Sequence, residues 1–268
     1  MTACLPDLPV YDLLARGLER AGAAVERAPT HEVARRLVAG RCDIAAMPTL
    51  DVLRMADDLS VLPSVAVSSW SYPYARLLLK SDLGDPISTV AFEPTAQQEV
   101  VLARLVLREH YGITPSFVPV PEATAALVGP YDAVLVTGAS APTVRAPGVA
   151  LDLGQEIYEL TQYPMVWALF VTRVGEATPE MLRAVKRAAA EAEANRAAWL
   201  RTMETTPALA EFYGTDLRVR YDDLVTASLT EITDLLYQQN VLEDSPEIPL
   251  VVFADEDVDD DEGLDPLV

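Results

Sequence analysis

The sequence holds few residues from which a metal site or a nucleophilic triad could be built. It has two histidines, His31 and His110, and two cysteines, Cys4 and Cys42. Zinc sites and Ser-His-Asp triads bring such residues together, whereas the two histidines here are far apart along the chain. We therefore expect no metal and no organic cofactor. Two cysteines give no disulfide framework, and a buried thiol is the plain interpretation of each.

Basic residues are also scarce. Lys and Arg number 20 against 41 Asp and Glu, so the formal net charge is −21. Nucleic acids and anionic membranes both bind basic surfaces, and neither is expected as a partner. No apolar run approaches the roughly 20 residues of a membrane span, and the first residues have no basic or apolar region of a signal peptide. The sequence thus predicts a cytoplasmic protein.

Glycine-rich phosphate loops are missing as well. Gly138 follows a predicted strand as a lone glycine turn, which matches neither the dinucleotide-binding loop nor the ATP-binding loop. Dinucleotide binding and ATP binding are therefore not expected. A small molecule of another kind is the expected ligand, and the sequence leaves the oligomeric state open.

Acidic residues gather at the end of the chain. The segment from Val241 to Val268 holds eleven of them and no Lys or Arg. Solubility and self-repulsion are the plain explanation of such a tail. Its apolar run, Ile248 to Phe253, can pair at a sheet edge, and disorder is expected beyond Asp255.

The first part of the chain alternates strands and helices. Short strands are expected at Thr2 to Leu5, Ala24 to Glu26 and Asp43 to Met47, and the runs between them carry apolar residues at helical spacing. Thr30 is a candidate N-cap of the second helix, and Pro48-Thr49 opens a third. This order predicts a parallel sheet covered by helices.

A second α/β unit follows two strand-like runs, Leu59 to Val67 and Tyr74 to Lys80. It contains a helix from Gln97 to Tyr111, and after Thr178-Pro179 the chain is nearly all helical. We assign three parts, which are residues 1–80 plus 172–242 as lobe I, residues 81–171 as an inserted lobe II, and residues 243–268 as an acidic tail. Two such units joined by two crossings form a cleft, where small molecules bind.

A hydroxyl-rich aromatic stretch lies where the chain is expected to cross between the lobes. It contains Ser69, Trp70, Ser71, Tyr72 and Tyr74, and Trp167 from a later strand is expected to join it. Amphipathic aromatic side chains with hydroxyls suit an aromatic or cyclic ligand. The alternative is a hinge whose aromatic rings simply pack.

Polar residues at the ends of elements are the other candidates. Thr95, Gln97 and Gln98 stand at the start of a helix, whose free amides suit a carboxylate, with ordinary capping as the alternative. Arg76, inside an apolar strand, can hold a substrate carboxylate or pair with a core acid. The candidate catalytic acid or base is Glu99 or Asp7. Further substrate-binding candidates are Thr49, Gln162 and Tyr163.

Five segments between about Leu5 and Leu242 share their pattern with one known family. They are Asp43 to Arg54, Leu62 to Val67, Leu151 to Glu156, Leu160 to Phe170 and Arg218 to Tyr221. They resemble the menaquinone-biosynthesis family of the futalosine pathway, specifically its chorismate dehydratase branch. The similarity is distributed along the chain rather than carried by one short motif.

The resemblance implies a two-lobed α/β fold like that of a type II periplasmic binding protein, with an interdomain cleft and a helical C-terminal part. The family enzyme removes water from chorismate without metal or organic cofactor. Its active site has an Asn in the first turn and a Ser in the second crossing, where this sequence has Pro6 and Ala75. Its Ser-Arg-Thr-Ser helix start becomes residues 96–99, Ala-Gln-Gln-Glu. Since proline and alanine side chains cannot hydrogen-bond, we expect a different and more apolar substrate.

Three functions stay open. The first is a cofactor-independent lyase or cyclase that acts on a small biosynthetic intermediate, for which secondary metabolism is one source. The second is a genuine chorismate dehydratase of menaquinone biosynthesis with substituted residues. The third is a non-catalytic intracellular protein that binds a small molecule. Turnover of candidate substrates separates the third function from the other two.

Overall fold

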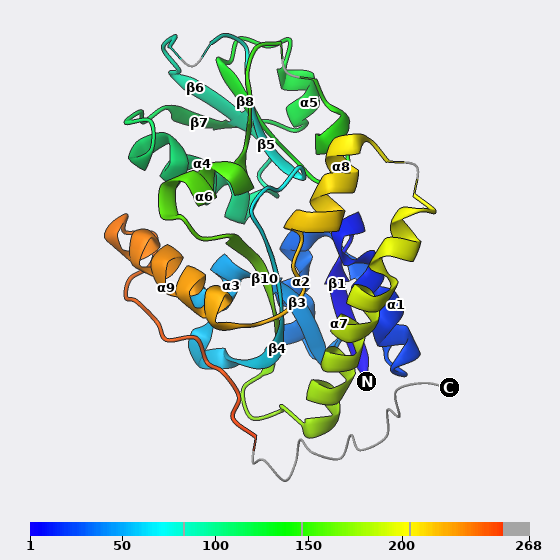
Figure 1. Cartoon of the computed structure of the whole chain (residues 1–268). Helices are drawn as coiled ribbons and strands as arrows, with labels where there is room; N and C mark the ends of the chain where they lie inside the picture. The colour runs from blue at the N-terminus through cyan, green and yellow to red at the C-terminus, as the bar shows by residue number, and fades with distance from the viewer. Residues whose placement is uncertain (83, 146, 204, 254–268) are drawn as a thin grey trace.

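The computed structural model describes residues 1–82, 84–145, 147–203 and 205–253, which form two lobes (Figure 1). Each lobe is built on a mixed five-stranded sheet. The sheet of lobe I has the order β2 (Ala24–Ala28), β1 (Thr2–Pro6), β3 (Ile44–Pro48), β10 (Met165–Arg173) and β4 (Leu59–Ser69). The predicted parallel pairing holds for β1, β2 and β3, whereas β10 runs antiparallel to β3 and β4.

Helices cover both faces of the lobe I sheet. They are α1 (Asp12–Arg20), α2 (Thr30–Val38), α3 (Thr49–Arg54), α7 (Pro179–Leu200) and α9 (Asp223–Gln238). Successive residues of β1 point to opposite faces, so Leu5 packs with Leu14 of α1 and Val185 of α7, while Cys4 packs with Val33 of α2 and Leu229 of α9. The sheet is therefore buried on both sides.

The long Ala-rich helix α7 lies very close to α1. Thr178 caps α7 as predicted, because its hydroxyl accepts a hydrogen bond from the Met181 amide at 3.3 Å. A Cβ atom on Gly17 of α1 would lie 2.6 Å from the Cα atom of Ala188. The small side chains of both helices allow this close approach.

Lobe II is the inserted unit. Its sheet has the order β7 (Ser116–Pro119), β6 (Thr89–Phe92), β8 (Ala133–Thr137), β5 (Ala75–Leu79) and β9 (Ala150–Asp152). Its helices are α4 (Gln97–Glu109), α5 (Ala123–Ala126) and α6 (Leu153–Thr161). Ala123 and Ala126 of α5 pack against one face of the sheet, and α4 and α6 pack against the other.

The boundaries between the lobes differ from those expected. Strand β5 pairs with β8 and β9 in lobe II, and β10 pairs with β3 and β4 in lobe I. The chain therefore crosses between the sheets at residues 70–74 and again between α6 and β10, earlier than the expected boundaries at 80 and 171. Sequence periodicity finds strands but does not say which sheet each one joins.

One apolar core extends through both lobes. It joins Leu14 and Phe170 of lobe I to Leu102 and Leu135 of lobe II, by way of Tyr72 and other aromatic residues at the crossing. Helix α8 (Pro207–Glu211) and the π-turn Phe212–Asp216 lie beside this crossing (Figure 1). The two lobes are thus packed against each other rather than separated by an open groove at this point.

Three further expectations concern single segments. The apolar run at the end of the chain pairs at a sheet edge as predicted, since Val61 of β4 bonds to the backbone of Pro249 and Val251. Thr30 is not an N-cap, because Pro29 occupies that position and Thr30 is already helical. The expected disorder beyond Asp255 lies outside the described residues. None of the described helices is both long and apolar enough to cross a membrane.

Candidate functional site

The candidate site lies where elements of both lobes meet. It is formed by the crossing at residues 70–74, the first turns of α3 and α4, the start of α6 and the first residues of β10. Strand β3 leads directly into α3, and β6 leads into α4. The two helices contact each other between the sheets (Figure 1).

Gln98 links the two lobes. Its Oε1 atom accepts a hydrogen bond from the Leu50 amide at 2.9 Å, and its Nε2 atom donates to the Trp167 carbonyl at 3.1 Å. The predicted site residue Thr49 lies beside it and donates from Oγ1 to the Val166 carbonyl at 2.6 Å. A cavity of about 10 Å³ borders Thr49, Leu50 and Gln98, which is close to the minimum for one water. Both ends of the Gln98 side chain therefore bind protein groups.

The aromatic residues at the crossing pack on one another. The ring of Tyr72 stacks on Trp167, with ring centroids 3.8 Å apart and planes 16° apart. Trp167 donates from Nε1 to Ser69 Oγ at 2.8 Å, which fixes the indole ring. Tyr74 contacts Tyr72 edge-on, and its hydroxyl hydrogen-bonds to that of Tyr213. Tyr72, Tyr74 and Trp167 are all buried, so these rings are part of the core.

Asp152 holds the crossing strand in place. Its Oδ1 atom accepts hydrogen bonds from the amides of Tyr72 at 2.6 Å, Gly154 at 2.9 Å and Gln155 at 3.1 Å. A Cβ atom on Gly154 would lie 2.6 Å from the backbone of Ser71 and Tyr72. The aspartate-leucine-glycine segment is therefore both the cap of α6 and a clamp on Tyr72. Its presence was visible in the sequence, but its partner 80 residues away was not.

Glu99, one of the two candidate acids or bases, lies in the first turn of α4 and is half-buried. Burial raises the pKa of Glu99 to about 7, a hydrogen bond from its own amide lowers it, and the charge of Asp51 raises it further. Among the described residues, no Lys or Arg forms an ion pair with Glu99. Its carboxyl group therefore changes charge near neutral pH, as a general acid or base requires.

Two tyrosines share the electrostatic environment of Glu99. Burial, followed by the charge of Glu99, raises the pKa of Tyr11. Burial also raises the pKa of Tyr72, and so do Tyr11 and Glu99. Both phenols stay protonated at neutral pH and can donate hydrogen bonds. Tyr11, in the turn after β1, was missed by sequence reasoning, although its place at the carboxyl end of a strand was a usable signal.

Several predicted residues make other contacts. Asp7 is exposed, and its carboxylate lies 3.8 Å from Arg27 Nε. Arg76 donates from one guanidinium nitrogen to the carbonyls of Ala141 and Val144 at 3.0 and 2.9 Å, so this part of its side chain anchors a lobe II turn.

Other predicted residues lie at the edge of the site or on the surface. Thr95 and Gln97 are exposed, and no side chain caps α4, so the expected alternative of capping is not realised. Ser71 donates to Asp216, and the ring of Trp70 lies 5.3 Å from the Arg218 guanidinium carbon.

The remaining two candidates, Gln162 and Tyr163, lie just after α6. Gln162 has a φ of 64° and ends that helix, and its side chain is exposed and donates to the carbonyls of Tyr158 and Glu159. The amide of half-buried Tyr163 donates to Thr161 Oγ1 at 3.1 Å. Both residues therefore make local contacts at the end of α6.

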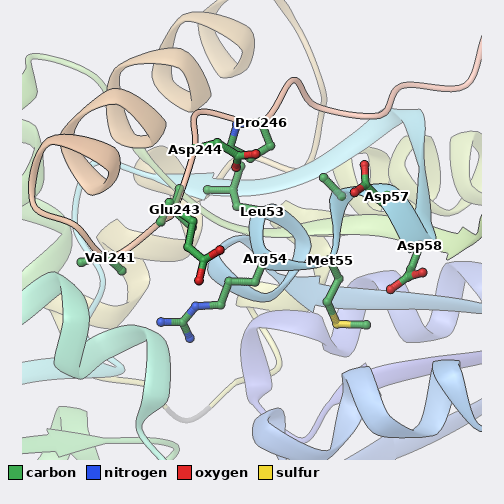
Figure 2. A pocket seen from close by; sticks show the side chains of 11 residues that line it. Leu53, Arg54, Met55, Asp57, Asp58, Val241, Glu243, Asp244 and Pro246 are labelled. Carbon is green, nitrogen blue, oxygen red and sulfur yellow. The ribbon is translucent and has the colours of Figure 1, made fainter.

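A pocket of about 510 Å³ lies elsewhere, between α3 and residues 241–246 (Figure 2). Four carboxylates, those of Asp57, Asp58, Glu243 and Asp244, line it together with Arg54. It contains none of the predicted site residues. This pocket is thus separate from the residues around Glu99.

Comparison with known proteins identifies the family. A family model described as menaquinone biosynthesis matches residues 1–238. The chain belongs to this menaquinone biosynthesis family. The resemblance inferred from five sequence segments is therefore confirmed at the level of the family.

Solved structures confirm the fold of this family member. Protein AF1704 from Archaeoglobus fulgidus has a TM-score of 0.67 and 15% identity, over 90% of this chain and 98% of that chain. The alkanesulfonate-binding protein SsuA from Xanthomonas axonopodis pv. citri, bound to MOPS, has a TM-score of 0.63 and 18% identity, over 94% and 97%. A Candida albicans protein described as having the generic periplasmic binding protein fold has a TM-score of 0.57 and 11% identity, over 93% and 92%. The predicted two-lobed α/β fold is correct.

Both departures from the family pattern that the sequence indicates are buried positions. Pro6 ends β1 and is buried, and Ala75 begins β5 with no exposed surface. The Ala75 amide donates to the Tyr72 carbonyl within the tight crossing. Neither side chain offers a hydrogen bond to a ligand.

Proposed function

We propose that this family member is a cofactor-independent enzyme of the lyase or cyclase type, which binds an uncharged cyclic small molecule between its lobes. The observation that carries the proposal is Glu99, a carboxyl group with a pKa of about 7 that raises the pKa of Tyr11 and Tyr72 and forms no ion pair with the described residues. Such a group accepts or donates a proton at neutral pH without help from a metal.

Tyr11 and Tyr72 supply the second part of the chemistry. No hydrogen bond of either hydroxyl to another described residue is found, and both phenols stay protonated. Two such donors near a proton-transferring carboxyl group suit a substrate whose carbonyl or hydroxyl oxygen gains negative charge during an elimination or ring closure. Glu99 then takes the proton from carbon or returns one to the leaving oxygen.

The charges around the site argue for an uncharged substrate. The charge of Asp51 raises the pKa of Glu99, and no basic side chain is among the causes of its shift. Arg76 donates to two backbone carbonyls of lobe II. A dianion such as chorismate would bring further negative charge to Glu99, so we expect the protein not to convert chorismate at a useful rate.

Substrate entry would require the lobes to separate. Tyr72 stacks on Trp167, and Gln98 hydrogen-bonds to Leu50 and Trp167. A ring that entered between Tyr72 and Trp167 would replace one stacked pair with two. In this proposal, the structure described above is the closed, ligand-free state of the protein.

The test uses proton exchange, because the exact product is unknown. The full chain is incubated in D₂O with a panel of cyclic hydroxy ketones and hydroxy acids, with chorismate included, and followed by proton NMR. We expect loss of a C–H signal, with or without product, for an uncharged member of the panel, and expect Glu99→Gln to abolish it while binding persists. Exchange that survives in Glu99→Gln, or no exchange with any member, contradicts the proposal.

A binding protein without catalysis is the second candidate, because SsuA, which shares the fold, is described as an alkanesulfonate-binding protein. MOPS is a suitable probe. A rise in melting temperature with MOPS, without proton exchange in the panel, would favour this candidate over the enzyme. The cytoplasmic location expected from the sequence stays a prediction.

A further inference from the structure

A cluster of three metal-type donors lies away from the candidate site. His110 follows the last residue of α4, and Glu156 and Glu159 lie one turn apart on α6, which packs beside α4. One ligand atom of each of the three side chains lies within 4.8 Å of the others. The sequence does not reveal this arrangement, because His110 and the two glutamates belong to different helices that lie far apart in the chain.

Tyr111 orients two of the three donors. Its hydroxyl donates to Glu156 Oε2 at 2.7 Å, and its ring packs edge-on against the His110 ring, with centroids 4.8 Å apart. Metal ligands are commonly held in this way by a second layer of hydrogen bonds and packing. The third donor, Glu159, lies at the surface 3.8 Å from His110 Nε2, and its Oε1 atom accepts a hydrogen bond from Gln155 Nε2 at 3.1 Å.

Among the described residues, the ion-pair partner of the carboxylates in this cluster is His110. Glu156 is buried, with 6% of its surface exposed, yet its hydrogen bond comes from a neutral phenol. Within the described part of the chain, neither Glu156 nor Glu159 forms an ion pair with Lys or Arg. The C-terminal end of α4, where His110 lies, adds the negative end of a helix dipole. Two carboxylates beside a helix C-terminus are stabilised by a bound cation.

We propose that His110, Glu156 and Glu159 bind a divalent ion of the zinc class, with water completing the coordination. An imidazole with two carboxylates suits zinc. Magnesium and calcium prefer sites in which every ligand is an oxygen atom. Tetrahedral zinc ligands lie about 3.3 Å apart, given bonds near 2.0 Å. To reach that spacing, the exposed His110 and Glu159 side chains would rotate toward Glu156, and Glu159 would exchange its hydrogen bond with Gln155 for the metal. The ion joins α4 to α6.

The test uses zinc alone and the full chain, stripped of metal with EDTA. Calorimetric titration with ZnCl₂ is expected to show one equivalent bound in the presence of a large excess of Mg²⁺, which saturates carboxylate clusters such as the acidic tail. Co²⁺ in place of Zn²⁺ is expected to give visible absorption of a site with four or five ligands. His110→Gln and Glu159→Gln are each expected to weaken zinc binding at least tenfold, and Tyr111→Phe about tenfold.

The other histidine is the matched control. His31→Gln, on α2, is expected to leave the zinc affinity unchanged. Both His110 and Glu159 are exposed, so their variants are expected to melt like the parent without metal. Zinc that Mg²⁺ displaces, affinity that is equal in His110→Gln and the parent, or no binding of one equivalent, each overturns the proposal. None of these outcomes bears on Glu99, so the two proposals fail separately.

Discussion

The raised pKa of Glu99 makes the free energy of unfolding depend on pH. Between the ordinary carboxyl value of 4.5 and about 7, the folded chain keeps a proton that the unfolded chain has lost. The free energy of unfolding therefore falls as the pH rises through this window. The same burial that tunes Glu99 for proton transfer makes the protein less stable at neutral pH than at the acid end of the window, as far as this residue is concerned.

Replacing Glu99 removes this dependence. Glu99→Gln is expected to be more stable than the parent by about 1–3 kcal/mol near pH 8 and about equally stable near pH 4. Urea unfolding at a series of pH values measures the difference. Glu19→Gln, at an exposed position of α1, is the control and is expected to follow the parent. A Glu99→Gln variant less stable than the parent at about pH 8 would mean that the buried carboxylate is compensated.

At the scale of elements, the start of α6 is the point on which the crossing depends. Asp152→Ala removes the helix cap and leaves the Tyr72 amide without its partner. We expect a loss of about 1–3 kcal/mol in the free energy of unfolding, together with altered tryptophan fluorescence as the Tyr72–Trp167 stack loosens. Gln155→Ala, at the exposed third residue of the same helix, is expected to change both little. Equal unfolding curves for the two variants would show that Asp152 is not a clamp.

The elements themselves were largely predictable, and the contacts between them were not. Apolar spacing, Thr178-Pro179 and the glycines that end helices placed most strands and helices within a few residues. Strand β9 was not predicted, because a three-residue strand has no periodicity to detect, and α6, which follows it directly, was not predicted either. The antiparallel direction of β10 depends on where the chain returns in space.

The site was predictable only in part, for the same reason. Tyr72, Trp167 and Glu99 stand out by residue type. Nothing in the sequence distinguishes the exposed Gln97 from the buried Gln98 beside it, because the half-turn of α4 that faces lobe I is set by packing. The contact between Asp152 and the Tyr72 amide also joins residues too far apart for local pattern to reveal.

At the scale of the whole molecule, Gln98 is expected to hold the lobes together. Gln98→Ala leaves the buried Leu50 amide and Trp167 carbonyl unpaired, at about 1–3 kcal/mol for each group. The lobes can recover hydration by separating, so small-angle X-ray scattering is expected to give a larger radius of gyration and melting is expected to occur earlier. Gln97→Ala is the neighbouring control without either change. Identical scattering and melting for both variants would remove Gln98 from this role.

The pairing of residues 249–251 with Val61 has a consequence for how molecules meet one another. Strand β4 is the last strand of the lobe I sheet, and an uncovered last strand offers amides and carbonyls to a second chain. A chain shortened after residue 254 keeps this cover, and we expect it to melt within a few degrees of the parent. A chain shortened after residue 243 loses it along with two more carboxylates, those of Asp244 and Glu247, and light scattering is expected to rise with concentration and time. The acidic end of the chain thus begins with a segment that keeps neighbouring copies from joining their sheets, and clear solutions of the shorter chain would contradict this.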